Sequence, residues 1–292
     1  MGISAKEIVT GRKTFFITPD TSLIPDSYLE EYFALGYECY FIENDKRTKL
    51  ETKLAILISL FHDVIFFFNV DYRIEGLNWA SLIRKIVERY NNQASIGVLY
   101  TKRQTKEERQ KLEHMYLYDM GLNCGCIQLE YQKKQNFDII ETILYANQAQ
   151  GRRKNIRALC TSACTYTFNT GFQTVTGSLQ DISASHFSFV SNDIKPDIDP
   201  YTKIKDFNFN IRGFLFHSSA ILIMKRPTPN GILYVFGFLS SNTGNAGLDE
   251  RLKQLLIPNL YKLMVSNCQT LLTQIFNKVE NGENLQEIQE LE

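Results

Sequence analysis

The first half of the chain alternates between short apolar runs and stretches in which apolar residues recur at helical spacing. The run Asp63–Val70 is apolar at almost every position, which is typical of a strand buried on both faces of a sheet. Five strand–helix pairs in succession predict a doubly wound sheet of five parallel strands. The predicted strands are Thr14–Thr18, Tyr37–Ile42, Asp63–Val70, Ser95–Tyr100 and Gly125–Leu129, and the predicted helices are Ser27–Leu35, Arg47–Phe61, Trp79–Tyr90, Lys106–Met120 and Phe137–Gln150.

The alternation of strand and helix patterns ends near residues 148–151. We expect the boundary between a first domain, 1–148, and a second, 149–280, at this point. Beyond it, short apolar segments are separated by Gly, Pro, Asn and Asp, which predicts a β-rich domain. Its predicted strands are Ala158–Phe168, Phe172–Leu179, His186–Val190, Arg212–Lys225 and Ile232–Leu239.

Helical spacing returns over Leu248–Val279, and we expect Pro258 to kink or break this last helix. Its predicted role is to cover the open end of the β-rich domain, and its later turns are candidates for pairing with a second copy in a homodimer. Residues 281–292 are rich in Gln and Glu and predict a disordered tail.

Charge and composition exclude several classes of protein. The 292 residues carry a formal net charge of +0, so no overall field attracts the chain to nucleic acid or to an acidic membrane. No apolar run is long enough to span a bilayer, and the amino terminus lacks the basic-then-apolar pattern of a signal peptide. We therefore expect a cytoplasmic protein without membrane insertion.

The 6 cysteines include two closely spaced pairs, Cys124 with Cys126 and Cys160 with Cys164. Four thiolates could in principle hold a metal ion, but the usual CxxC spacing is absent and no histidine is close in sequence to either pair. We interpret the cysteines as free thiols in a reducing compartment and expect no metal.

Candidate ligand-binding residues lie at the start of the β-rich half. Arg153 and Arg157 are four positions apart with Arg152 beside them, and guanidinium groups bind phosphate oxygens and the O6/N7 edge of guanine. Asp181 and Ser183 are two apart on a strand, so an acceptor and a donor point to the same face.

These two motifs, with the segment continuing to His186, resemble the RxxxR and [D/N]xSxxG signatures of the PilZ family. The apolar segment after His186, then Ile211–Leu215 and Tyr234–Phe238, are similar to the later strands of the family's barrel. The resemblance covers the second half of the chain and implies an antiparallel β-barrel with a C-terminal helix. The final Gly of the second signature is His186 here.

The resemblance also implies a ligand, the bacterial messenger cyclic di-GMP, and neither catalysis nor a cofactor. The arginines would bind phosphate and guanine, Asp181 would accept from guanine N1–H and N2–H, and Ser183 would bond an amine or a phosphate. His186 leaves two outcomes open, since its imidazole either stacks on or bonds the base, or blocks the pocket. If the backbone there needs a positive φ, a histidine is modestly strained.

The first half resembles the receiver domain of bacterial response regulators, which also has five β/α units. Asp71 and Thr101 match the acid that accepts phosphate and the nearby hydroxyl. However, Asp20 alone follows the first strand, where receivers use an acidic pair to hold magnesium, and no Lys-Pro follows Leu129. We interpret this half as a degenerate receiver used for contacts. Flavin binding at Thr18–Ser22 is disfavoured because that loop has no glycine.

The sequence therefore predicts an α/β domain followed by a β domain, in a signalling protein that binds cyclic di-GMP, changes its domain arrangement and acts on an unidentified protein partner. Two alternatives remain. One is a PilZ-like structural adaptor that no longer binds the messenger, and the other is a regulator phosphorylated at Asp71.

Overall fold

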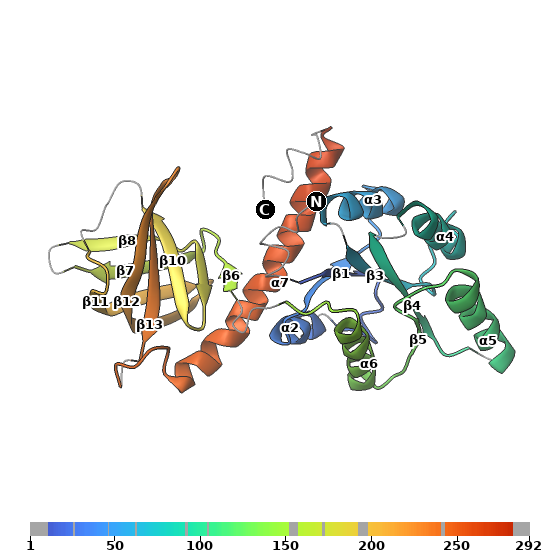
Figure 1. Ribbon diagram of the computed structural model, residues 1–292, viewed down its shortest axis with the longest axis horizontal. Coiled ribbons are helices and arrows are strands. Elements are labelled where there is room, and N and C mark those ends of the chain that lie inside the picture. Colours follow the sequence, from blue (N-terminus) through green and yellow to red (C-terminus); the bar gives the residue numbers. More distant parts are fainter. Residues whose placement is uncertain are drawn as a thin grey trace. The chain divides into compact units, whose positions relative to one another are not determined.

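The computed structural model describes residues 11–282 apart from 26, 46, 62, 91–92, 104, 152–156, 171–172, 192–197 and 241–242. The chain divides into two compact units (Figure 1). We call residues 1–153 with 268–292 the α/β unit and residues 154–267 the β unit. None of the described helices combines the length and the hydropathy that crossing a bilayer requires.

The α/β unit contains a parallel sheet of five strands in the order β2-β1-β3-β4-β5, which is the order of flavodoxin-like sheets. This confirms the predicted doubly wound fold. The strands are β1 (Lys13–Ile17), β2 (Glu38–Ile42), β3 (Val64–Asn69), β4 (Ala94–Thr101) and β5 (Cys126–Leu129). The helices before α7 are α2 (Ser27–Ala34), α3 (Leu50–Phe61), α4 (Trp79–Tyr90), α5 (Lys106–His114), the π-helical η1 (Met115–Asp119) and α6 (Lys133–Ala146).

Helices cover both faces of this sheet, as the apolar run in β3 predicts (Figure 1). On one face, Phe68 of β3 packs against Trp79 of α4, with ring centroids 5.9 Å apart. On the other, Phe16 of β1 stacks on Tyr32 of α2, which in turn stacks 4.4 Å from Phe137 of α6. Two helices show the larger differences from the prediction. Helix α6 begins and ends four residues earlier, and the predicted helix after Lys106 passes into a π-helical turn at Met115.

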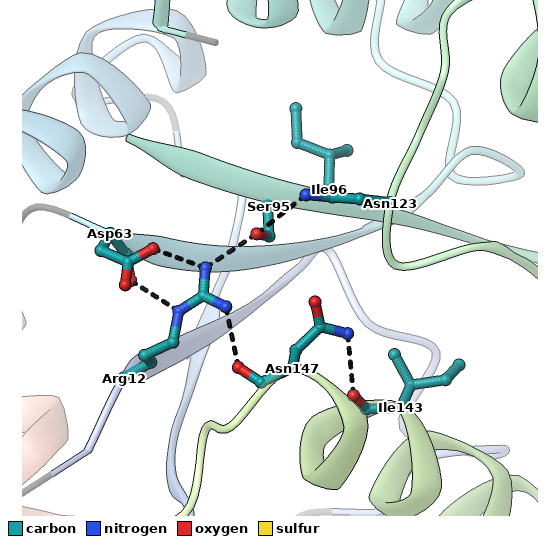
Figure 2. Close-up of polar contacts among 7 residues, drawn as sticks. All are labelled: Arg12, Asp63, Ser95, Ile96, Asn123, Ile143 and Asn147. Carbon is teal, nitrogen blue, oxygen red and sulfur yellow. Dashed lines mark hydrogen bonds and ion pairs between the residues drawn. The ribbon is translucent and has the colours of Figure 1, made fainter. Parts of the chain in front are cut away.

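Arg12 connects the starts of two strands of the α/β unit to the end of a helix (Figure 2). Its Nη2 donates to Oγ of Ser95 at 2.7 Å and lies 2.7 Å from Oδ1 of Asp63, while Nε donates to the carbonyl oxygen of Asp63 at 3.2 Å. Its Nη1 donates to the carbonyl oxygen of Asn147, just after α6, at 2.9 Å. One guanidinium therefore joins the starts of β3 and β4 to the end of α6.

The chain that follows α6 is held against the α/β unit up to Gly151. The side chain of Gln150 donates to the carbonyl oxygen of Leu35 at 2.7 Å, and the amide of Gly151 donates to that of Gly36 at 2.9 Å. A Cβ on Gly11 would lie 2.5 Å from the carbonyl oxygen of Ala149, so only glycine permits this approach.

The β unit contains eight antiparallel strands in the order β6-β9-β10-β13-β12-β11-β7-β8. Tyr166 of β7 and Phe189 of β10 stack with centroids 4.1 Å apart although three strands separate them in that order, so the sheet curls around one aromatic core. No pairing between the described strands joins the two ends of the sheet, so the predicted barrel is not closed by hydrogen bonds. The strands are β6 (Arg157–Leu159), β7 (Cys164–Asn169), β8 (Thr174–Ser178), β9 (Asp181–Ser183), β10 (His186–Ser191), β11 (Lys203–Ile211), β12 (Phe214–Thr228) and β13 (Gly231–Leu239).

The sequence prediction failed at three places in this unit. Strand β11 was missed because a register shift between Ile204 and Phe207 interrupts its period-two pattern. Arg212 does not start a strand, because it forms with Gly213 a tight turn in which both residues have positive φ, 52° and 95°. The predicted strand from Ala158 to Phe168 is divided into β6 and β7 by a turn at Ser162–Ala163.

The last helix, α7 (Glu250–Glu280), is continuous through Pro258, so the expected break is absent. Proline has no N–H to donate to the carbonyl of Gln254, four residues earlier. Both residues are exposed, so water can bond that carbonyl instead. The first part of α7 buries Leu256 in the core of the β unit. Its later turns bury Leu272 in the core of the α/β unit.

We predict that replacing Arg12 with Ala lowers the free energy of unfolding by about 2–3 kcal/mol, because Ser95 and the carbonyl of Asn147 lose a charged donor in a partly buried position. Urea denaturation followed by circular dichroism measures this. The matched control is Asp63→Asn, because asparagine tolerates the positive φ of 49° at this position. This variant should lower the free energy of unfolding by less than about 1 kcal/mol, since the carboxylate of Asp63 is exposed. Equal losses in the two variants would contradict the assigned role of Arg12.

Candidate functional site

The candidate residues of the β unit lie on three short strands, β6, β9 and β10. Strand β9 pairs with β6 on one side, with Arg157 opposite Ser183, and with β10 on the other, with Asp181 opposite Ser188. The side chains of Asp181 and Ser183 share one face, while Ile182 between them points into the core and is fully buried. The three strands therefore present a polar face outside the aromatic core.

Arg157 and Asp181 form an ion pair on this face. Nε of Arg157 lies 3.4 Å from Oδ1 of Asp181, and 40% of the arginine side chain is exposed against 12% of the aspartate. That oxygen is buried and has no hydrogen-bond donor among the described residues. The contact is therefore a charge interaction without a hydrogen bond, and a buried carboxylate oxygen left in this state costs about 1–3 kcal/mol.

Ser188 also belongs to the polar face, although sequence analysis did not select it. It stands opposite Asp181 in the register of β9 and β10, is 2% exposed, and its Oγ has no hydrogen-bond partner among the described residues. The alternation of β10 places Ser188 on the same face as His186, and this is the signal in the sequence that could have identified it.

The hydroxyl of Ser183 is occupied within its own turn. Its Oγ accepts from the amide of His186 at 2.9 Å and from that of Ser185 at 3.3 Å, and it donates to the carbonyl oxygen of His186 at 3.0 Å. In this arrangement the hydroxyl of Ser183 closes the turn between β9 and β10.

His186 has no positive φ, so the backbone strain considered from the sequence is absent. It pairs with Gly237 of β13, and its Cδ2 lies 3.7 Å from the position of a Cβ on that glycine, so the imidazole covers the glycine. Its Nδ1 lies 2.8 Å from Oγ of Ser185. Burial, together with the charge of Arg157, lowers the pKa of His186, so the ring is largely uncharged at neutral pH.

Arg152 and Arg153 lie outside the described residues. Of the six residues predicted to bind a ligand, the structure therefore brings together Arg157, Asp181, Ser183 and His186. Among the described residues, no group of three or more His, Cys, Asp and Glu side chains is placed to hold a metal ion.

Asp71, the receiver-like acid, follows β3 and is engaged on both oxygens. Its Oδ2 accepts from the amide of Thr101 at 2.7 Å and from its hydroxyl at 2.6 Å, and its Oδ1 pairs with Arg103. Burial opposes ionisation, but these bonds and the charge of Arg103 lower the pKa of Asp71. Oδ1 of Asp20 accepts hydrogen bonds from the amide and the hydroxyl of Ser22.

No family model matches the sequence, and no curated protein matches it. Among solved structures, the PilZ domain of YcgR with c-di-GMP from Escherichia coli is similar to 41% of this chain and is covered over 96% of its own length, with 16% identity and a TM-score of 0.33. YcgR in complex with c-di-GMP, also from Escherichia coli, is similar to 41% of this chain and covered over 50%, with 15% identity and a TM-score of 0.33.

The Bacillus subtilis inhibitor of motility, MotI, is similar to 39% of this chain and covered over 52% of its own, with 11% identity and a TM-score of 0.31. This chain thus spans about half the length of the longer YcgR chain and of MotI. At this identity and TM-score the similarities carry no inference about what this chain binds.

We predict that the α/β unit does not accept a phosphoryl group at Asp71, because Arg103 and Thr101 occupy both carboxylate oxygens and Asp20, the one acid directly after β1 in sequence, is bonded to Ser22. Incubation with acetyl phosphate and magnesium, followed by intact-mass spectrometry, should show no adduct. Asp71→Asn is the control. An adduct on the parent protein that this variant lacks would contradict the prediction and favour a phosphorylated regulator.

Proposed function

We propose that this chain is a signalling protein without catalytic activity that binds cyclic di-GMP at the polar face of β6, β9 and β10. The observation that carries the proposal is the pair of buried polar atoms, Oδ1 of Asp181 and Oγ of Ser188, that have no hydrogen-bond partner beside a part-exposed Arg157. Buried polar atoms in this state are uncommon, and a bound ligand would supply their partners.

The chemistry of the face fits a guanine nucleotide. A carboxylate accepts two hydrogen bonds from guanine N1–H and N2–H, and Asp181 has one oxygen without a donor. Once guanine is hydrogen-bonded to the carboxylate of Asp181, the guanidinium of Arg157 can bind a phosphate or the O6/N7 edge of a base. Because the guanidinium of Arg157 is not hydrogen-bonded to Asp181, replacing it with guanine breaks only an ion pair.

Arg152 and Arg153 complete the proposed site. They lie five and four positions before Arg157, the first residue of β6, and the resemblance of Arg153 and Arg157 to an RxxxR signature supports their assignment to the phosphates. A phosphate anion would neutralise several arginines that otherwise repel one another.

A path from this face to the rest of the chain runs through α7. The side chain of Asn267 donates to the carbonyl oxygen of Leu159 in β6 at 2.7 Å, so the edge of β6 away from β9 is bound to that helix. We propose that ligand binding at Arg157 fixes the conformation of β6 and thereby changes the conformation of α7. A protein partner would bind one of the two conformations preferentially. The 6 free cysteines support a reducing cytoplasm as the compartment.

We predict that Arg157→Ala weakens cyclic di-GMP binding by roughly tenfold to a hundredfold, because one charge-assisted hydrogen bond is worth about 1.5–3 kcal/mol. Isothermal titration calorimetry on the full chain measures the dissociation constant. Arg226→Ala is the matched control, since Arg226 is exposed on β12 in the same unit, and it should leave affinity unchanged. Equal affinities for the two variants would show that Arg157 does not bind the ligand.

The same titration distinguishes a cyclic di-GMP receptor from a structural adaptor that no longer binds the messenger. The proposal requires the parent protein to bind, and requires His186→Gly, which uncovers Gly237, to bind with an affinity within about tenfold of the parent. A parent without binding and a His186→Gly variant that binds would show that the imidazole blocks the pocket, and the adaptor would be the correct description.

Asp181 should provide the selectivity for guanine. We predict that Asp181→Ala reduces the affinity for cyclic di-GMP by at least roughly tenfold and leaves any residual cyclic di-AMP binding unaltered, because adenine offers no N1–H donor. Asp206→Ala, at an exposed position of β11, is the control. If Asp181 only supports the strand, thermal stability will fall and both nucleotides will lose affinity equally.

A further inference from the structure

The outside of the β unit continues from the polar face into an apolar surface. Asp181 of β9 stands opposite Ser188 of β10. Ser188 stands opposite Val235 of β13, which in turn stands opposite Met224 of β12. The neighbours of Ser188 and Val235 along their strands are aromatic residues of the core, so this row of side chains lies on the outside of the sheet. The row therefore changes from polar to apolar as it crosses the four strands.

A β-bulge in β12 adds a second apolar side chain at the end of this row. The register of β12 against β13 shifts between Leu222 and Met224, and Ile223 is the extra residue. Leu222 is fully buried in the core, whereas Ile223 and Met224 are both 40% exposed. The bulge thus places two consecutive apolar side chains on the outside, where a regular strand would place only one.

The side chain of Ile223 lies over Gly237 of β13. Its Cδ1 is 2.9 Å from the position of a Cβ on that glycine, and Cγ2 of Ile221 is 3.7 Å from the same position. Cδ2 of His186, from β10, is also 3.7 Å from it, so the apolar side chains of β12 continue up to the imidazole. We call this surface the apolar face, and it consists of Ile221, Ile223, Met224 and Val235.

The apolar face can bind a flat ring but cannot read its edge. Its side chains carry no hydrogen-bonding group apart from the weakly accepting sulfur of Met224. Aliphatic side chains pack on the face of an aromatic ring, and the sulfur of methionine makes favourable contacts with such rings. Every nucleic acid base has a face of this kind, so packing on it does not distinguish guanine from adenine.

The length of the row indicates a ligand with two bases. Neighbouring strands lie about 4.8 Å apart, so β9 and β12 are separated by roughly 14 Å. A single purine, with two fused rings, is too short to bond Oδ1 of Asp181 and also cover Met224. Two bases joined in one molecule can contact both ends of the row.

We propose that the β unit binds a cyclic dinucleotide asymmetrically, with the edge of one guanine on Asp181 and Ser188 and the flat face of the second base on the apolar face. This inference rests on the proposed function and adds which base is read. Because hydrogen bonds from Asp181 read only the first base, the second base can be guanine or adenine. The chain therefore accepts cyclic GMP–AMP that has the same linkages as cyclic di-GMP, and it discriminates against cyclic di-AMP.

Isothermal titration calorimetry of the full chain with the three cyclic dinucleotides tests this selectivity without a variant. Cyclic GMP–AMP should bind within about threefold of cyclic di-GMP, because one guanine is enough to satisfy Asp181. Cyclic di-AMP should bind at least roughly tenfold more weakly than either. Cyclic GMP–AMP that binds as weakly as cyclic di-AMP would show that the protein reads the edges of both bases, and would overturn the inference.

The variant Ile223→Ser tests the apolar face itself. It should weaken binding of both cyclic di-GMP and cyclic GMP–AMP on the order of tenfold, because the second base loses apolar contact area. Leu215→Ser is the matched control, since Leu215 is 72% exposed near the other end of β12, and it should keep the parent affinity. Thermal melting followed by circular dichroism verifies that both variants fold.

The same titrations distinguish a failure of this inference from a failure of the proposed function. Parent affinity in Ile223→Ser, combined with weakened binding in Arg157→Ala, would overturn the apolar face and retain the polar face as the ligand site. A parent protein that binds none of the three cyclic dinucleotides would overturn both.

Discussion

The pairing of a three-residue strand, β9, with β6 and β10 is the constraint on which the polar face of this protein depends. Strand β9 has a buried isoleucine on one side and Asp181 with Ser183 on the other, so the core packing of Ile182 fixes the direction of both polar side chains. Arg157 and Ser188 reach the same face only because the two neighbouring strands hold their register against β9.

A second constraint acts on the chain before the β unit. Arg12 holds the carbonyl of Asn147, and Gly151 is bound to Gly36, so the segment after α6 is fixed to the α/β unit up to residue 151. At Arg157 the chain is fixed again, by β9 in the β unit. The residues between, 152–156, include two of the three arginines proposed to bind phosphate.

The sequence was most informative where packing imposes a regular period. The parallel sheet was predictable because Val64–Asn69 is buried on both faces and the strands alternate with amphipathic helices. Strand β11 was missed because a register shift breaks its alternation. A kink or break in α7 was expected at Pro258 because a single sequence does not show that Pro258 and Gln254 are exposed. Ser188 was missed because a serine in an apolar strand has no local signal until its partner across the sheet, Asp181, is known.

Hydrogen–deuterium exchange with and without cyclic di-GMP tests the central claim most directly, since it reports where the ligand acts without changing a residue. The account predicts that the messenger slows exchange of amides in β6, β9 and β10, while the amides of β3, in the core of the α/β unit, keep their rates. Protection confined to the α/β unit, or unchanged exchange in all three strands at a saturating ligand concentration, would contradict it.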